Sequence, residues 1–135
     1  MQGVTINTTK RMKDEKGDLV VFLRKSNLSE KHKTFGQIYF VSFNKKSAVR
    51  GNHYHKKWHE HFGVITGRVR VVLENIKTKE RMELVLSARK NQYTRLSIEP
   101  YIAHAIQSLT NSASLLSYTN SEWKDGSDTY PHKLI

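Results

Sequence analysis

The chain has 135 residues, no cysteine, and 23 Lys and Arg against 12 Asp and Glu, which gives a formal net charge of +11. This length suits one domain, so we expect a single unit over residues 1–135 with its core at about 14–130. Without cysteine the chain forms no disulfide, uses no thiolate in catalysis, and holds a metal only through nitrogen and oxygen. The polar first eleven residues and the lack of an apolar run of about 18 residues predict no membrane contact and a cytoplasmic protein.

The excess of positive charge predicts an anionic partner. Basic residues are spread along the whole chain, whereas nucleic-acid-binding proteins usually concentrate them on one element. We therefore expect no nucleic acid as partner and favour a small phosphorylated substrate, with Arg24 and Lys46 among the candidate substrate-binding residues. A merely basic surface would give the same composition.

Short apolar or alternating runs follow one another along the chain, separated by polar turns, and helical periodicity of useful length is absent. Many short strands at a spacing of about 8 to 12 residues predict an all-β sandwich or barrel. The turns and loops are expected at residues 27–33, 44–47, 66–67, 74–80 and 87–91, with a polar tail at 122–131. The strands are expected at residues 19–23, 37–43, 48–55, 62–65, 69–73, 81–86, 92–98, 101–107 and 114–118.

Four of the seven histidines lie between His53 and His61. On a strand, His53 and His55 project from the same face. Glu60 follows at an odd offset, so residues 56–59 should form a turn and Glu60 should lie on the returning, neighbouring strand. Two histidines and a carboxylate brought together across a hairpin suit a divalent metal. His104, which begins the strand after Pro100, is placed to add a third imidazole from across the barrel.

Two other interpretations of this cluster remain. On a helix, His55 and His59 at i, i+4 would share a metal as in HExxH sites, but the flanking segments are rich in β-branched and aromatic residues, which favours strands. Alternatively, the histidines are solvated surface groups. His59 and His61 are in any case expected at the surface or behind the ligands.

The sequence resembles the cupin superfamily, whose first motif is G-x5-H-x-H-x3,4-E-x6-G. His53, His55, Glu60 and Gly67 match this motif in identity and spacing, while Ser47 stands at its opening glycine. Of the second motif, G-x5-P-x-G-x2-H-x3-N, only His104 matches. The resemblance implies a single cupin jelly roll, with any metal held by His53, His55, Glu60 and His104. We expect at most one divalent metal ion, zinc or a similar one, and no organic cofactor.

Three further segments are similar to sugar-nucleotide cupins: Asp14-Glu15-Lys16-Gly17, Phe40-Val41-Ser42-Phe43-Asn44, and Arg50-Gly51-Asn52-His53-Tyr54. They resemble segments of the dTDP-4-dehydrorhamnose 3,5-epimerases, and the run from Arg50 to Lys56 is also similar to dTDP-sugar 3,4-ketoisomerases. Glu60 and the residues Asp128-Thr129-Tyr130 resemble the C-terminal cupin domain of capsular-polysaccharide enzymes that act on UDP-4-keto-6-deoxy sugars.

The resemblance implies an isomerase for surface-polysaccharide synthesis, an epimerase or ketoisomerase acting on a nucleoside-diphosphate 4-keto-6-deoxy sugar. In such enzymes the histidine at the position of His53 is the base and the arginine at the position of Arg50 holds phosphate. A 4-keto group acidifies the neighbouring C–H, so a base of near-neutral pKa can remove the proton. If a metal occupies His53, the candidate bases are Tyr118 and His61.

A non-catalytic module that binds a metal or sugar is the alternative function, and an oxygen-using metallo-cupin is a third. Because a short open sandwich leaves strand edges that pairing would cover, we expect a homodimer.

Overall fold

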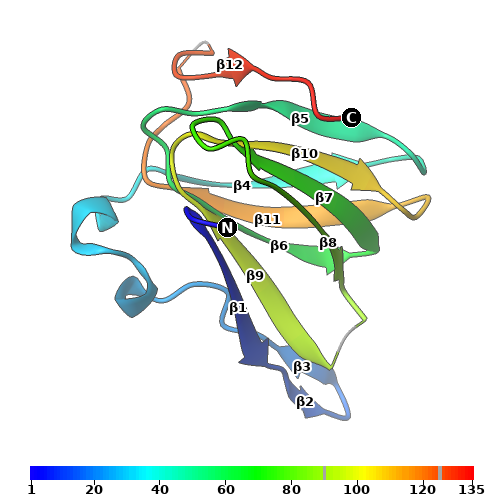
Figure 1. The fold of residues 1–135 in the computed structure, drawn as a ribbon. Helices are drawn as coiled ribbons and strands as arrows, with labels where there is room; N and C mark the ends of the chain where they lie inside the picture. The colour runs from blue at the N-terminus through cyan, green and yellow to red at the C-terminus, as the bar shows by residue number, and fades with distance from the viewer. Residues whose placement is uncertain (90, 125) are drawn as a thin grey trace.

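The computed structural model describes residues 1–89, 91–124 and 126–135, and it is an all-β sandwich of two five-stranded sheets with a small separate hairpin. This architecture is a single cupin jelly roll (Figure 1). Lys90 and Asp125, which fall in the turn expected at 87–91 and the tail expected at 122–131, lie outside the described residues. No helix in the described part of the chain is long and apolar enough to cross a membrane.

Both sheets are antiparallel throughout. The first sheet has the order β1 (Val4–Lys10), β9 (Gln92–Ile98), β6 (Glu60–Thr66), β11 (Ala113–Thr119), β4 (Gln37–Phe43). The second has the order β12 (Tyr130–Pro131), β5 (Val49–Tyr54), β10 (Ile102–Ser108), β7 (Arg68–Asn75), β8 (Arg81–Ser87). The hairpin pairs β2 (Met12–Asp14) with β3 (Gly17–Leu19).

The apolar core lies between the two sheets because alternate residues of each strand point inward. Leu96 and Leu115 from the first sheet and Val71 and Leu73 from the second are almost completely buried. This core fills one part of the interior, and the remaining part forms a cavity lined by both polar and apolar side chains, described below.

The expected strand at 19–23 is wrong beyond Leu19. Residues 20–36, which we call the crossing segment, run over the outer face of the first sheet and contain two 3₁₀ turns, Lys25–Asn27 and Glu30–His32 (Figure 1). The apolar residues Val20 to Leu23 are half-buried on that face rather than paired in a sheet. Phe22, for example, packs edge-to-face on Tyr93 with 6.3 Å between ring centroids.

Two edge strands of the large sheets were not predicted from the sequence, and neither was the small hairpin of β2 and β3. β1 pairs with β9 at the edge of the first sheet, and β12 pairs with β5 at the edge of the second. β12 lies within the expected polar tail, and its Pro131 is tolerated because an edge strand can lack one backbone donor. The tail therefore returns to the sandwich and contributes to the site.

Candidate functional site

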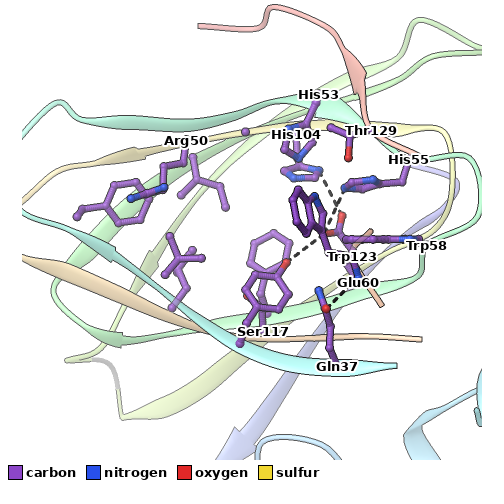
Figure 2. A pocket seen from close by; sticks show the side chains of 17 residues that line it. Gln37, Arg50, His53, His55, Trp58, Glu60, His104, Ser117, Trp123 and Thr129 are labelled. Carbon is purple, nitrogen blue, oxygen red and sulfur yellow. Dashed lines mark hydrogen bonds and ion pairs between the residues drawn. The ribbon is translucent and has the colours of Figure 1, made fainter. Parts of the chain in front are cut away.

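Four side chains converge at one end of the interior: His53 on β5, His55 just beyond its end, His104 on β10, and Glu60 at the start of β6. Each of the three imidazoles offers a nitrogen within 4.8 Å of the others. The Glu60 carboxylate oxygens lie 3.7 Å from His55 Nε2 and 3.5 Å from His104 Nδ1. Figure 2 shows the three imidazoles pointing toward one another beside Glu60.

The topology explains this convergence and corrects two expectations. His53 lies directly opposite His104 on the neighbouring strand, so His104 comes from beside His53 and not from across the barrel. The turn after His55 is present, but it crosses between the sheets, so β5 and β6 do not form a hairpin. Glu60 therefore approaches the imidazoles from the opposite sheet.

Arg50 faces the same cavity as His53 because β5 contains a β-bulge. Gly51 and Asn52 together stand opposite Ala105, while Arg50 pairs with Ile106 and His53 with His104. Both bulge residues have positive φ, +92° at Gly51 and +59° at Asn52. One extra residue in a strand shifts the alternation of faces. Arg50 therefore points toward the cavity, although it lies three positions before His53 and would face the other way on a regular strand.

Backbone and aromatic contacts fix the orientation of His55. The Asp128 carbonyl oxygen lies 2.6 Å from His55 Nδ1. Because a carbonyl only accepts, Nδ1 donates to it, and Nε2 faces Glu60. Trp58 stacks on the ring at 4.4 Å between centroids, and the Asp128 carboxylate accepts from the Lys56 and Lys57 N–H groups at 2.9 Å each.

The electrostatics of the cluster favour neutral imidazoles. Burial, followed by repulsion from neighbouring histidines, lowers the pKa of His53 and of His104 to about 3. Burial raises the pKa of Glu60 to about 6. His104 Nδ1 is buried without a hydrogen-bond partner, which is costly for a polar atom. The imidazoles and the Glu60 carboxylate form a set of ligands that fits a divalent metal, and the unpaired His104 Nδ1 is free to be one of the ligand atoms. The Asp128 carbonyl holds His55 from behind, as is usual for a metal-binding histidine.

A residue that the sequence analysis missed is Tyr39. It lies on β4 in the first sheet, and its hydroxyl donates to Glu60 Oε1 at 3.4 Å. Burial and the nearby Glu60 raise the pKa of Tyr39, so it is a neutral proton donor. The alternation of Gln37, Tyr39, Val41 and Phe43 along the predicted strand would have placed Tyr39 on the inward face.

The cavity around these groups has a volume of about 350 Å³. One end is polar and holds the histidine cluster, and the other end is apolar. Arg50 is exposed beside the apolar end, where its Nε donates to the Ser42 carbonyl at 3.2 Å and its guanidinium lies over the Phe43 ring. The apolar lining comes from Val41, Phe43, Phe62, Ile106 and Leu115.

Three predicted site residues are not brought to this cavity. Tyr118 lies on the outward face of β11, because Leu115 and Ser117 occupy the inward face, and its hydroxyl donates to the Thr34 carbonyl at 3.1 Å. Arg24 lies on the crossing segment, and Lys46 is exposed in the turn after β4.

His61, the other candidate base, also faces outward on the first sheet, where its Nδ1 lies 2.7 Å from Ser97 Oγ. His59 is half-buried on the same outer side, stacked on His32 of the crossing segment with 3.3 Å between ring centroids.

Solved structures with this fold include several enzymes that act on nucleotide sugars. The 3,4-ketoisomerase QdtA from Thermoanaerobacterium thermosaccharolyticum, solved as a histidine-to-asparagine mutant with TDP-4-keto-6-deoxyglucose, is 22% identical with a TM-score of 0.78, over 96% of this chain and 87% of that one. The 3'-monoepimerase ChmJ from Streptomyces bikiniensis, in complex with dTDP-quinovose, is 16% identical with a TM-score of 0.83, over 96% and 69%. These likenesses show the fold.

The capsular polysaccharide assembling protein CapF from Staphylococcus aureus is 22% identical with a TM-score of 0.68, over 75% of this chain but 27% of that one. A search of curated proteins gives no match. The family described as "Polysaccharide biosynthesis C-terminal domain" matches residues 12–130. Because this match spans most of the sequence, the chain belongs to the polysaccharide biosynthesis C-terminal domain family.

Proposed function

We propose that this protein is a sugar-nucleotide isomerase of surface-polysaccharide biosynthesis, which moves a proton at a carbon beside the keto group of a nucleoside-diphosphate 4-keto-6-deoxy sugar. The observation that carries the proposal is the shared cavity of Arg50, His53 and Tyr39. In this cavity Arg50 would bind the anion, His53 would act as base and Tyr39 as proton donor, around a space in which a sugar fits. The fold neighbours, solved with TDP-linked sugars, support this substrate class.

His53 is the proposed base. It is more open than His55 and His104, which are 4% and 6% exposed, so its ring is the one a substrate reaches first. Its pKa of about 3 in the free protein is low for a base. A diphosphate held by Arg50 would raise the pKa of His53, because nearby negative charge favours the imidazolium. The tethered diphosphate also places the sugar beside the ring.

Tyr39 is the proposed acid, in place of Tyr118. Tyr39 comes from the first sheet and His53 from the second, so a sugar ring lying between the sheets would have one group on each face. Removal of a proton from one face and delivery to the other inverts the carbon, which is epimerisation. This arrangement favours an epimerase over a ketoisomerase, since the latter can work with one base on one face.

A divalent metal, where bound, would be held by His53, His55, His104 and Glu60 and would polarise the keto oxygen. His53 would then have no free lone pair and would not act as the base, while Tyr39, hydrogen-bonded to Glu60, would remain the proton donor. Without a metal, Tyr39 supplies the proton that neutralises the enolate and His53 remains the base.

The test is incubation of the purified protein with a panel of nucleoside-diphosphate 4-keto-6-deoxy sugars in heavy water. Deuterium at the carbon next to the keto group, read by mass spectrometry and NMR, is the expected result. If no substrate of the panel exchanges with either metal-loaded or chelated protein, the proposal is wrong and the non-catalytic binding module is favoured.

A further inference from the structure

A second polar cavity lies on the opposite side of the first sheet, between its outer face and the crossing segment. Its volume is about 190 Å³, which corresponds to about six waters at roughly 30 Å³ each. Three hydroxyls and two amides line it: Thr5, Ser29, Ser97, Asn7 and Asn27. We call it the outer cavity, and we call the cavity that holds the histidine cluster the inner cavity. Strand β6 contributes to both: Glu60 and Phe62 line the inner cavity, and His61 lines the outer one.

Arg95 lies behind the lining of the outer cavity, next to lining residues but not itself among them. On the outer face of the sheet it stands directly opposite Asn7 of β1, two residues from Ser97, and its Nη1 donates to Asn27 Oδ1 at 3.2 Å. Directly opposite residues have their Cβ atoms about 5 Å apart. Three residues that line the cavity therefore lie around Arg95: Ser97 on the same strand, Asn7 on the neighbouring strand and Asn27 on the crossing segment.

The charge of Arg95 is buried without a countercharge. The residue is only 4% exposed, and no carboxylate of the described residues forms an ion pair with it. Its other hydrogen bond goes to the Phe22 carbonyl at 2.8 Å, while Nε is buried without a partner. Burial lowers the pKa of Arg95, yet a guanidinium stays charged. A buried, unpaired charge is expensive, and a bound anion would offset it.

The remaining lining groups suit an anion. His32 Nδ1 lies 3.1 Å from the Asn120 amide nitrogen, which donates, so the N–H of a neutral His32 is at Nε2. Hydroxyls, amides and imidazole N–H groups all donate to oxyanions. The one carboxylate in the lining, Glu99, is exposed, and it faces His32 rather than Arg95.

We propose that the outer cavity binds a small tetrahedral oxyanion, inorganic phosphate or the phosphate of a phosphomonoester, with Arg95 as its buried positive charge. The hydroxyl, amide and imidazole groups of the lining would donate to the anion, and the guanidinium of Arg95 behind them would offset its negative charge. The site is separate from the inner cavity, so it does not depend on the proposed isomerase activity.

The test is calorimetry and thermal unfolding with inorganic phosphate and with glycerol phosphate, each against chloride at constant ionic strength. We expect saturable binding of one anion and a rise in melting temperature with the logarithm of its concentration. Binding of inorganic phosphate alone identifies a free ion as the ligand, and binding of both identifies the phosphate group. Arg95→Met should weaken binding at least tenfold, while Arg68→Met, the same charge change on an exposed residue of the second sheet, should not.

Asn7→Asp gives a second, independent reading, since it puts a carboxylate directly opposite Arg95. We expect this variant to melt higher than wild type in phosphate-free buffer and to lose the response to phosphate. Asn111→Asp, in the exposed turn before β11, should change neither. Equal phosphate responses in wild type, Arg95→Met and Asn7→Asp would overturn the proposal, as would no response in wild type.

Discussion

Arg50 and His53 project into the same cavity although they are three positions apart, because the Gly51–Asn52 bulge adds one residue to β5. A regular strand would turn one of the two away. The bulge is held from outside: Asn52 Oδ1 accepts from the backbone N–H groups of Leu134 and Ile135 at 2.8 and 3.2 Å. The proposed phosphate-binding residue and the proposed base therefore depend on one backbone irregularity.

Substitution of Gly51 by alanine tests this dependence. A Cβ at Gly51 would lie 2.6 Å from the His104 carbonyl oxygen, and its φ of +92° is unfavourable for any side chain. We expect a loss of more than about 1 kcal/mol in unfolding free energy and a lower exchange rate, because β5 must move away from β10. Gly17→Ala, where φ is also positive but nothing lies within 4 Å, should leave activity unchanged. Equal activity of Gly51→Ala and wild type would contradict the role of the bulge.

The second prediction separates the base from the acid. In chelated protein, where His53 keeps its lone pair, His53→Asn should reduce solvent deuterium exchange by about 10² to 10⁴, the usual cost of a missing general base. Tyr39→Phe should leave exchange measurable and block formation of the inverted product, because only the delivery of the proton from the other face is lost. Exchange and product are read in one NMR experiment. Full exchange by chelated His53→Asn protein would refute the base role of His53.

The third prediction concerns the metal and the support behind His55. We expect about one equivalent of zinc or a similar ion in purified protein, and a lower melting temperature after chelation. Asp128→Ala removes two hydrogen bonds to the loop that carries His55. It should lower metal affinity about tenfold, as loss of outer contacts to a ligand does. Far less than one equivalent, with no thermal shift on adding zinc, manganese or nickel, would reject the metal.

Much of the fold follows from local patterns, whereas the site depends on long-range pairing. The strands expected at 37–43 and 92–98 coincide with β4 and β9, since alternation is a local signal. The convergence of His53 and His55 follows for the same reason. The sheet to which each strand belongs, and so the approach of Glu60 from the opposite side, is set by pairings between distant segments.

The misplacement of Tyr118 illustrates the same limit. Tyr39 and Tyr118 both lie on strands of the first sheet, and sequence alone does not say which face of a strand points inward when both faces carry apolar residues. On β11 the outward face is apolar because the crossing segment packs on it: Phe35 lies 6.0 Å from Tyr118 between ring centroids. Where a segment covers a sheet from outside, an apolar strand face can thus point away from the core, so hydrophobicity alone does not identify the inward face.

The fourth prediction is loss of stability of the metal-free protein in acid. Burial lowers the pKa of His53 and His104 to about 3 and of His61 to about 4, from an ordinary 6.5. Unfolding therefore takes up protons below pH 6.5, and the free energy of unfolding falls as the pH drops from 6.5 toward 4. Glu60 acts in the opposite direction, because its pKa is raised from 4.5 to about 6, but this one carboxyl opposes these three imidazoles and His59, whose pKa burial also lowers to about 4.

Urea unfolding of chelated protein between pH 7.5 and 4 measures this dependence. The free energy of unfolding should decline over this range, and His61→Asn should make the decline shallower by removing one group with a depressed pKa. A free energy of unfolding that stays constant or rises between pH 6.5 and 4.5 would contradict the prediction.

The last prediction is the homodimer expected from the sequence, and the structure indicates which surface to test. β4 is an edge strand of the first sheet, and its outward residues Ile38 and Phe40 are 61% and 75% exposed, next to Phe35 at 66%. Neighbouring exposed aromatic and aliphatic side chains of this kind are a usual sign of a contact surface. Phe40→Glu should give a monomer in light scattering at micromolar concentration, because a buried unpaired carboxylate is unfavourable. Val85→Glu, at an exposed position of β8 in the second sheet, serves as the matched control and should remain dimeric. Wild-type protein that is monomeric under the same conditions would exclude the dimer.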